Sequence, residues 1–195
     1  MKHLVISFII LGFAFSFAPL PSHADQLFGD FKRLPDEVER GFYIGADFGF
    51  FNVLGDDLGR RSAINPGFSL SFVTGYDLIK YLSIEGIYTI ALTEASPNDV
   101  VLEGGVNTFL LDLATKFQYP LGRFYPFLSV GGGVSYSIPS FTFENDNYKL
   151  NVLISAGVEF YTFLRHYSLY AKASYYYVDL PINATMFSGG LKYTF

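Results

Sequence analysis

Apolar residues alternate with small or polar residues along most of the chain after residue 40. In the segment 41–51, for example, Phe42 and Ile44 alternate with Tyr43 and Gly45. A period of two places alternate side chains on opposite faces of a β-strand. The same pattern recurs about eight times, and it predicts strands over 41–51, 67–76, 81–93, 107–119, 128–136, 151–160, 168–177 and 187–195.

Two kinds of connection join these predicted strands, and the two kinds alternate along the chain. Short turns are expected at 77–80, 120–123 and 162–165, and each ends in a base that an aromatic residue follows within two positions. The other connections are longer or more polar, and they cover 53–66, 94–105, 138–147 and 179–183. Short turns that alternate with long loops are typical of an up-and-down antiparallel meander whose two ends face different compartments.

The less apolar face of the predicted strands is rich in Gly, Ser and Thr, with only isolated charges. Small residues and a few charges of both signs suit the crowded interior of a small barrel, where a buried charge needs a partner. Strands of this length cross a bilayer when they are tilted. We therefore predict an all-β fold, an eight-stranded antiparallel up-and-down transmembrane β-barrel with its apolar face toward lipid. Its expected lumenal charge network is Asp47, Glu85, Asp112, Lys116, Glu159, Lys172 and Lys192.

The first 40 residues have a different character. A basic start is followed by an apolar run over 4–18, by Pro19 and Pro21, and by small residues around Ala24. This order is typical of a cleaved secretory signal, and the apolar run is short for a membrane anchor, the alternative reading. We predict a signal peptide over 1–24, a periplasmic N-terminal segment over 25–40 and the barrel over 41–195. Both ends of the mature chain should then face the periplasm.

Composition narrows the class of protein further. Only 16% of the 195 residues are charged, against about 25% in average soluble domains. No stretch reaches the roughly 18 to 20 apolar residues of a membrane helix, and there is no Cys for disulfide or thiolate chemistry. A net charge of −5 argues against nucleic acid as a partner. Tyr and Phe fall near both ends of the predicted strands, where interfacial aromatic belts are expected.

The last predicted strand resembles the C-terminal targeting strand of bacterial outer-membrane barrels. That strand ends in Phe and carries apolar or aromatic residues at alternate positions before it, which here are Leu191, Tyr193 and Phe195. The resemblance implies that these three residues form the assembly signal that the barrel-assembly machinery recognises. It also implies a place in the outer membrane of a Gram-negative cell, among outer-membrane lipids and lipopolysaccharide.

Two further resemblances concern the hairpins. The segments 41–49, 75–85 and 123–135 look like the hairpins of small eight-stranded barrels of the OmpA/OmpX type. More weakly, the strings RGFYIGADFG and GYDLIKYLSIEG are similar to small barrels associated with adventurous gliding motility in myxobacteria and their predatory relatives. This second resemblance implies envelope or motility proteins as partners.

Little in the sequence indicates catalysis. After cleavage His166 is the only histidine, and it lies in a short turn that the topology assigns to the periplasmic side. There is no HExxH spacing, no Cys-based metal spacing and no GxxxxGK[ST] phosphate loop. We predict no catalytic, cofactor or metal residues, and a non-enzymatic structural or interaction role with the long loops at the cell surface. The alternatives are a narrow pore or lipid/small-solute transport barrel and, least favoured, a lipid-modifying enzyme.

Overall fold

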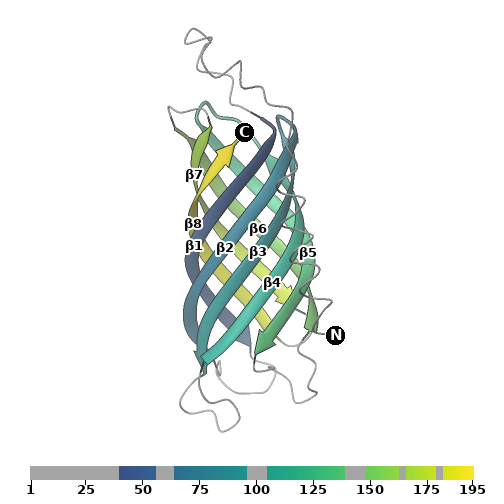
Figure 1. The fold of residues 1–195 in the computed structure, drawn as a ribbon, viewed down its shortest axis with the longest axis vertical. Helices are drawn as coiled ribbons and strands as arrows, with labels where there is room; N and C mark the ends of the chain where they lie inside the picture. The colour runs from purple at the N-terminus through teal and green to yellow at the C-terminus, as the bar shows by residue number, and fades with distance from the viewer. Residues whose placement is uncertain (1–39, 56–63, 96–104, 139–147, 163–165, 179–181) are drawn as a thin grey trace. The chain divides into compact units, whose positions relative to one another are not determined.

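The computed structural model describes residues 40–55, 64–95, 105–138, 148–162, 166–178 and 182–195. These residues form eight strands that follow one another around a closed barrel (Figure 1). Each strand pairs antiparallel with the next, and the last pairs antiparallel with the first. The predicted eight-stranded antiparallel barrel is confirmed. The strands are β1 (Phe42–Gly55), β2 (Ile64–Ile79), β3 (Leu82–Ala95), β4 (Gly105–Gln118), β5 (Phe124–Ile138), β6 (Tyr148–Tyr161), β7 (Tyr167–Val178) and β8 (Ile182–Thr194).

Several strands are longer than the alternation alone predicts. β2 extends through Asp77 to Ile79, where we expected a turn, because Asp77 points inward and accepts a hydrogen bond from Ser83. At its other end, β2 includes Asn65 and Pro66 within the predicted long loop. A register shift between Asn65 and Phe68 accommodates the proline, which has no N–H to donate to the ladder.

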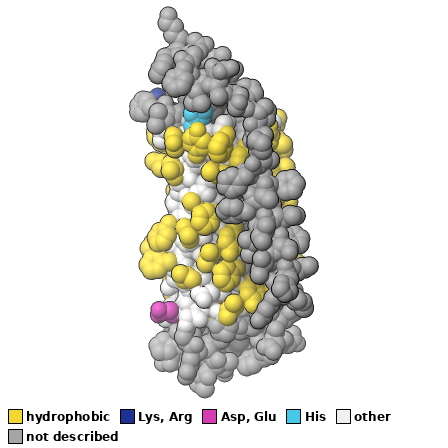
Figure 2. Space-filling view, viewed as in Figure 1, with side chains coloured by type: hydrophobic (Ala, Val, Ile, Leu, Met, Phe, Trp, Pro, Cys, Tyr) yellow, Lys and Arg dark blue, Asp and Glu magenta, His cyan; other side chains and the backbone are white. Residues whose placement is uncertain are grey.

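The two faces of the strands separate as the period of two predicts. Outward side chains are mostly apolar, and Ile84 and Phe48 are 41% and 59% exposed. Their neighbours Glu85 and Asp47 are buried inside the barrel. On the described part of the face in Figure 2, hydrophobic side chains dominate and charged ones are sparse. Within the described residues, no helix is long and apolar enough to cross a membrane.

The hairpin ends distinguish the two ends of the barrel. β2–β3, β4–β5 and β6–β7 are joined at the end where β1 begins and β8 finishes, which we call the short-turn end. There Gly122, with φ of +66°, adopts the left-handed backbone that the turn before β5 requires. The opposite end is called the long-loop end. The predicted signal peptide, residues 25–39 and most of the predicted long loops lie outside the described residues.

Candidate functional site

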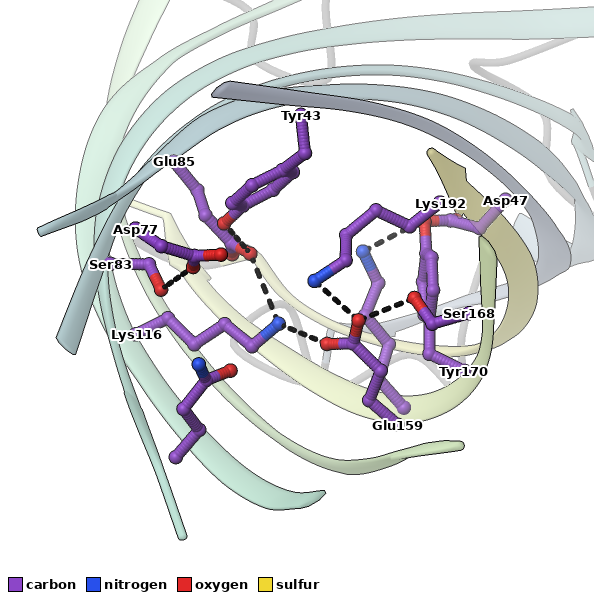
Figure 3. A network of polar contacts seen from close by, with 12 residues as sticks. Tyr43, Asp47, Asp77, Ser83, Glu85, Lys116, Glu159, Ser168, Tyr170 and Lys192 are labelled. Carbon is purple, nitrogen blue, oxygen red and sulfur yellow. Dashed lines mark hydrogen bonds and ion pairs between the residues drawn. The ribbon is translucent and has the colours of Figure 1, made fainter. Parts of the chain in front are cut away.

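Charged side chains meet inside the short-turn half of the barrel, around Glu159 on β6 (Figure 3). Nζ of Lys116 lies 2.7 Å from Glu159 Oε2, and Lys192 forms an ion pair with Glu159 Oε1. Ser168 donates a hydrogen bond to the same Oε1. Glu159 is fully buried, so these three partners replace the water that its carboxylate would otherwise bind.

The same two lysines extend the network across the lumen. Lys116 Nζ lies 3.5 Å from Glu85 Oε1, which also accepts a hydrogen bond of 2.8 Å from the Tyr43 hydroxyl. Lys192 Nζ donates to the Tyr161 hydroxyl at 3.0 Å and lies 4.4 Å from the centroid of the Tyr43 ring. Cation–π contacts of this kind add to the stabilisation of a desolvated ammonium group.

A second, smaller ion pair lies beside this cluster. Lys172 Nζ is 2.7 Å from Asp47 Oδ2, which also accepts a hydrogen bond of 3.0 Å from the Tyr170 hydroxyl. Lys116 and Lys192 of the first group and Lys172 of the second line a cavity of about 20 Å³. That volume holds about one water molecule.

Asp112 on β4 is the predicted network residue that the structure leaves apart. It is 3% exposed, and neither of its carboxylate oxygens makes a hydrogen bond within the described part of the chain. Its register neighbour Gly133 leaves room for it, since a Cβ there would lie 2.6 Å from Asp112 Oδ1. Asn151, on the other side of Gly133, is also buried without a hydrogen-bond partner for its amide among the described residues.

The structure thus joins the other predicted residues into two groups, one around Glu159 and one around Asp47. Sequence reasoning left out their neutral partners Tyr43, Tyr161, Ser168 and Tyr170, although alternation placed Tyr43, Ser168 and Tyr170 on the inward face. It also placed Asp77 in a turn, whereas Asp77 is a further buried acid. A search for hydroxyl donors on the same face as buried carboxylates would have found the tyrosines.

The long-loop half of the interior contains more apolar side chains than the small and polar inward face that we predicted. Phe51, Leu110, Leu153 and Met186 point inward there and are at most 2% exposed. The Phe51 and Tyr176 rings lie 6.2 Å apart across this space. Other members of the same buried apolar cluster are Val53, Ala91, Val178 and Ala184. We call this group the apolar plug, and buried hydroxyl side chains such as Thr93 and Thr108 share this half of the interior with it.

The predicted assembly-signal residues Leu191, Tyr193 and Phe195 lie on the outer face of the barrel at the short-turn end. Tyr193 packs edge-to-face on Phe195, with ring centroids 4.9 Å apart. His166 stacks on Tyr193, and its Nδ1 lies 2.8 Å from the Thr194 carbonyl oxygen. The histidine therefore holds the last strand. No group of three or more His, Cys, Asp or Glu suited to a metal ion occurs among the described residues.

Comparison with known proteins agrees with this architecture. A family model described as "Outer membrane protein beta-barrel domain" matches residues 13–195. No curated protein matches the chain in sequence.

Three solved structures share the fold. Neisserial surface protein A is 19% identical with a TM-score of 0.63, covering 80% of this chain and 97% of that one. OprG from Pseudomonas aeruginosa is 11% identical with a TM-score of 0.56, covering 84% of this chain and all of that one. Ail, the attachment invasion locus protein of Yersinia pestis, is 17% identical with a TM-score of 0.50, covering 80% of this chain and all of that one. None of these matches supports the resemblance to gliding-motility barrels.

Proposed function

The chain belongs to the outer membrane protein β-barrel family, and we propose that it is a closed, non-enzymatic barrel that holds surface segments in place for interaction. Its location is the outer membrane. The observation that carries the proposal is the filled interior. An ionic network occupies the short-turn half, and the apolar plug occupies the long-loop half. A barrel whose interior is packed along its length acts as a scaffold, so that function falls to the segments between its strands.

The proposal differs from the narrow-pore alternative in one measurable respect. A pore needs a continuous water-filled path, and the buried side chains of Leu110, Leu153 and Met186 in the long-loop half favour a closed interior. In planar bilayers, the purified barrel should show no stepwise conductance beyond that of a bilayer without protein. Reproducible, ion-selective steps from folded protein would establish the pore reading instead. A transport role for an apolar solute would be revealed by a ligand that co-purifies with the barrel.

The enzyme alternative would rest on His166. Its Nδ1 donates a hydrogen bond to the Thr194 carbonyl oxygen and its ring packs on Tyr193, so Nε2 would be the nitrogen that acts as a base. We expect membrane lipids to be unchanged when a strain that expresses His166→Ala is compared with its parent. A changed lipid pattern in that strain, with the barrel still folded, would assign a catalytic role to His166.

Partners at the surface remain a prediction. The segments 56–63, 96–104, 139–147 and 179–181 connect strands at the long-loop end, and envelope or motility proteins are candidates to bind them. Crosslinking in intact cells, followed by purification of the barrel, tests for such a partner. A barrel with these segments shortened to tight turns is the matched control, because it keeps all eight strands. Capture that is equal for both forms would contradict the scaffold proposal.

A further inference from the structure

The small cavity in the short-turn half of the barrel lies among the lysines of both ion-pair groups. Its volume is about 20 Å³, and Lys116, Lys172 and Lys192 all line it. These lysines come from β4, β7 and β8, and their side chains are at most 7% exposed. Figure 3 shows Lys116 and Lys192 reaching toward one another across the lumen. Three buried ammonium groups therefore share one small space.

The acids of the network contribute little to the wall of this cavity. Asp47 binds Lys172, and Glu159 binds the other two lysines, but neither acid belongs to the described lining. Glu85 does line the cavity, and its Oε1 already accepts a hydrogen bond from the Tyr43 hydroxyl. The described lining thus carries three positive charges against one negative charge.

The wall of the cavity also contains hydrogen-bond donors that lack acceptors. An ammonium group has three N–H donors, and Lys172 has one carboxylate partner, Asp47, among the described residues. Ser129 is 1% exposed and lines the cavity, and its hydroxyl has no hydrogen-bond partner in the described part of the chain. Buried donors without acceptors are unfavourable. One acceptor placed in the cavity would satisfy the hydroxyl and the free N–H groups together.

We propose that this cavity binds a small monovalent inorganic anion, chloride, between the three ammonium groups and the Ser129 hydroxyl. Chloride accepts hydrogen bonds and donates none, which suits a lining made mainly of N–H and O–H donors. The three lysines balance Asp47, Glu85 and Glu159, so the ion is held by the donors that face it and not by a net charge of the network. The inference does not depend on what the surface segments bind.

Water is the alternative occupant, since the cavity has room for about one water molecule. A buried water molecule must donate hydrogen bonds as well as accept them. In the described lining its acceptors would be the Glu85 carboxylate and the hydroxyls of Ser129, Ser155 and Tyr170. The Tyr170 hydroxyl already donates to Asp47, and the Ser155 hydroxyl already donates to Ser174. The two occupants differ in charge, and a comparison of salts therefore distinguishes them.

The dependence of stability on chloride tests the inference. The barrel is folded into phosphatidylcholine vesicles, and its unfolding in urea is compared in sodium chloride and in sodium gluconate, an anion too large for the cavity. Equal ionic strength keeps general screening the same in both salts. At a chloride concentration about ten times the Kd, the unfolding equilibrium of the wild type should shift toward the folded barrel by about tenfold relative to gluconate.

A pair of serine variants locates the effect. Ser129→Val removes the hydroxyl and places methyl groups in the cavity, so this variant should unfold equally in the two salts. Ser69→Val is the matched control. Ser69 is also 1% exposed and its hydroxyl also lacks a partner among the described residues, but it does not line the cavity. The control should keep the chloride dependence of the wild type. Heat-modifiable migration in gel electrophoresis checks that each variant folds.

Two results of this assay would overturn the proposal. A wild-type barrel that unfolds equally in chloride and gluconate would show that water fills the cavity. An equal chloride dependence in the wild type and in Ser129→Val would place the chloride effect elsewhere. Bromide provides a second measurement that needs no variant. Crystals of the wild-type barrel grown in sodium bromide should show an anomalous scattering peak inside the cavity, and a cavity without that peak would contradict the proposal.

Discussion

At the scale of single residues, Glu159 is the acid with the most ion-pair partners among the described interior residues. Lys116 and Lys192 both bind its carboxylate, whereas Glu85 contacts only Lys116 through an ion pair. Removing one member of a buried ion pair leaves the other charge without compensation, and the cost exceeds the net value of the pair itself. The two glutamates should therefore respond differently to the same substitution.

We expect Glu159→Gln to lower the free energy of unfolding by about 3–5 kcal/mol, because two buried ammonium groups lose their shared anion. Equilibrium unfolding in urea of the barrel folded into lipid vesicles measures this change. Glu85→Gln is the matched control, and its effect should be smaller, since Lys116 keeps its 2.7 Å contact with Glu159. A larger loss for Glu85→Gln than for Glu159→Gln would contradict the described network.

Asp112 allows a prediction of opposite sign. Its carboxylate is buried beside Asn151 without a hydrogen bond in the described part of the chain. Asp112→Asn removes the charge and keeps the shape, so it should raise the free energy of unfolding by about 1–3 kcal/mol. The same change at Asp47, which is paired with Lys172, should lower it. The measurement is again urea unfolding, and a destabilised Asp112→Asn barrel would show that Asp112 has a partner.

At the scale of elements, the period-two pattern predicts the strands well because it follows from the two different environments of a barrel strand. A strand in a barrel has one face in lipid and one inside, so nearly every residue obeys the alternation. The pattern is less informative where two apolar residues are adjacent, as at Phe50-Phe51, Leu110-Leu111 and Val152-Leu153. In each pair alternation places one residue, Phe51, Leu110 or Leu153, on the inward face. The apolar plug was missed because we took the outward residue of each pair as the informative one and expected only small and polar residues inside.

The partners of the charged residues were beyond sequence reasoning for a different reason. Alternation fixes the face of a residue but not its height in a tilted barrel. Lys116 and Glu159 are 43 positions apart, and Tyr43 and Glu85 are 42 apart. Contacts over such separations depend on how far each strand is shifted along its neighbour. The sequence therefore indicated which residues lie inside, while their pairing required the register of the strands.

The last strand provides a test of the assembly signal. Phe195 is exposed on the outer face, and its backbone N–H donates to the Phe42 carbonyl. Phe195→Ala should reduce the amount of barrel inserted in the outer membrane while export to the periplasm continues. Phe187→Ala, on the same face of β8, is the control and should insert normally. Fractionation of cells and heat-modifiable migration report both steps. Equal insertion of both variants would remove the proposed role of the terminal residue.

At the scale of the whole molecule, the direction of the barrel in the membrane is a prediction that the sequence makes easy to test. The chain has no Cys, so a single introduced thiol reports one position. Leu121→Cys, in the turn before β5, should be protected from a membrane-impermeant maleimide in intact cells, because that end is predicted to face the periplasm. Ser140→Cys, between β5 and β6, should react. Labelling of the first and protection of the second would reverse the predicted orientation.

The pairing of β1 with β8 has a consequence for how the protein is made. Thirteen residue pairs, from Tyr43 with Thr194 to Gly55 with Ile182, join the two strands that are farthest apart in the chain. Until β8 has been synthesised, β1 has no partner with which to close the barrel. A half-built sheet would expose unpaired amides and carbonyls to hydrocarbon, which tolerates neither. The barrel can therefore close only after the whole chain has reached the outer membrane. A chain that stops before β8 lacks the partner of β1, and we expect it to be degraded in the periplasm.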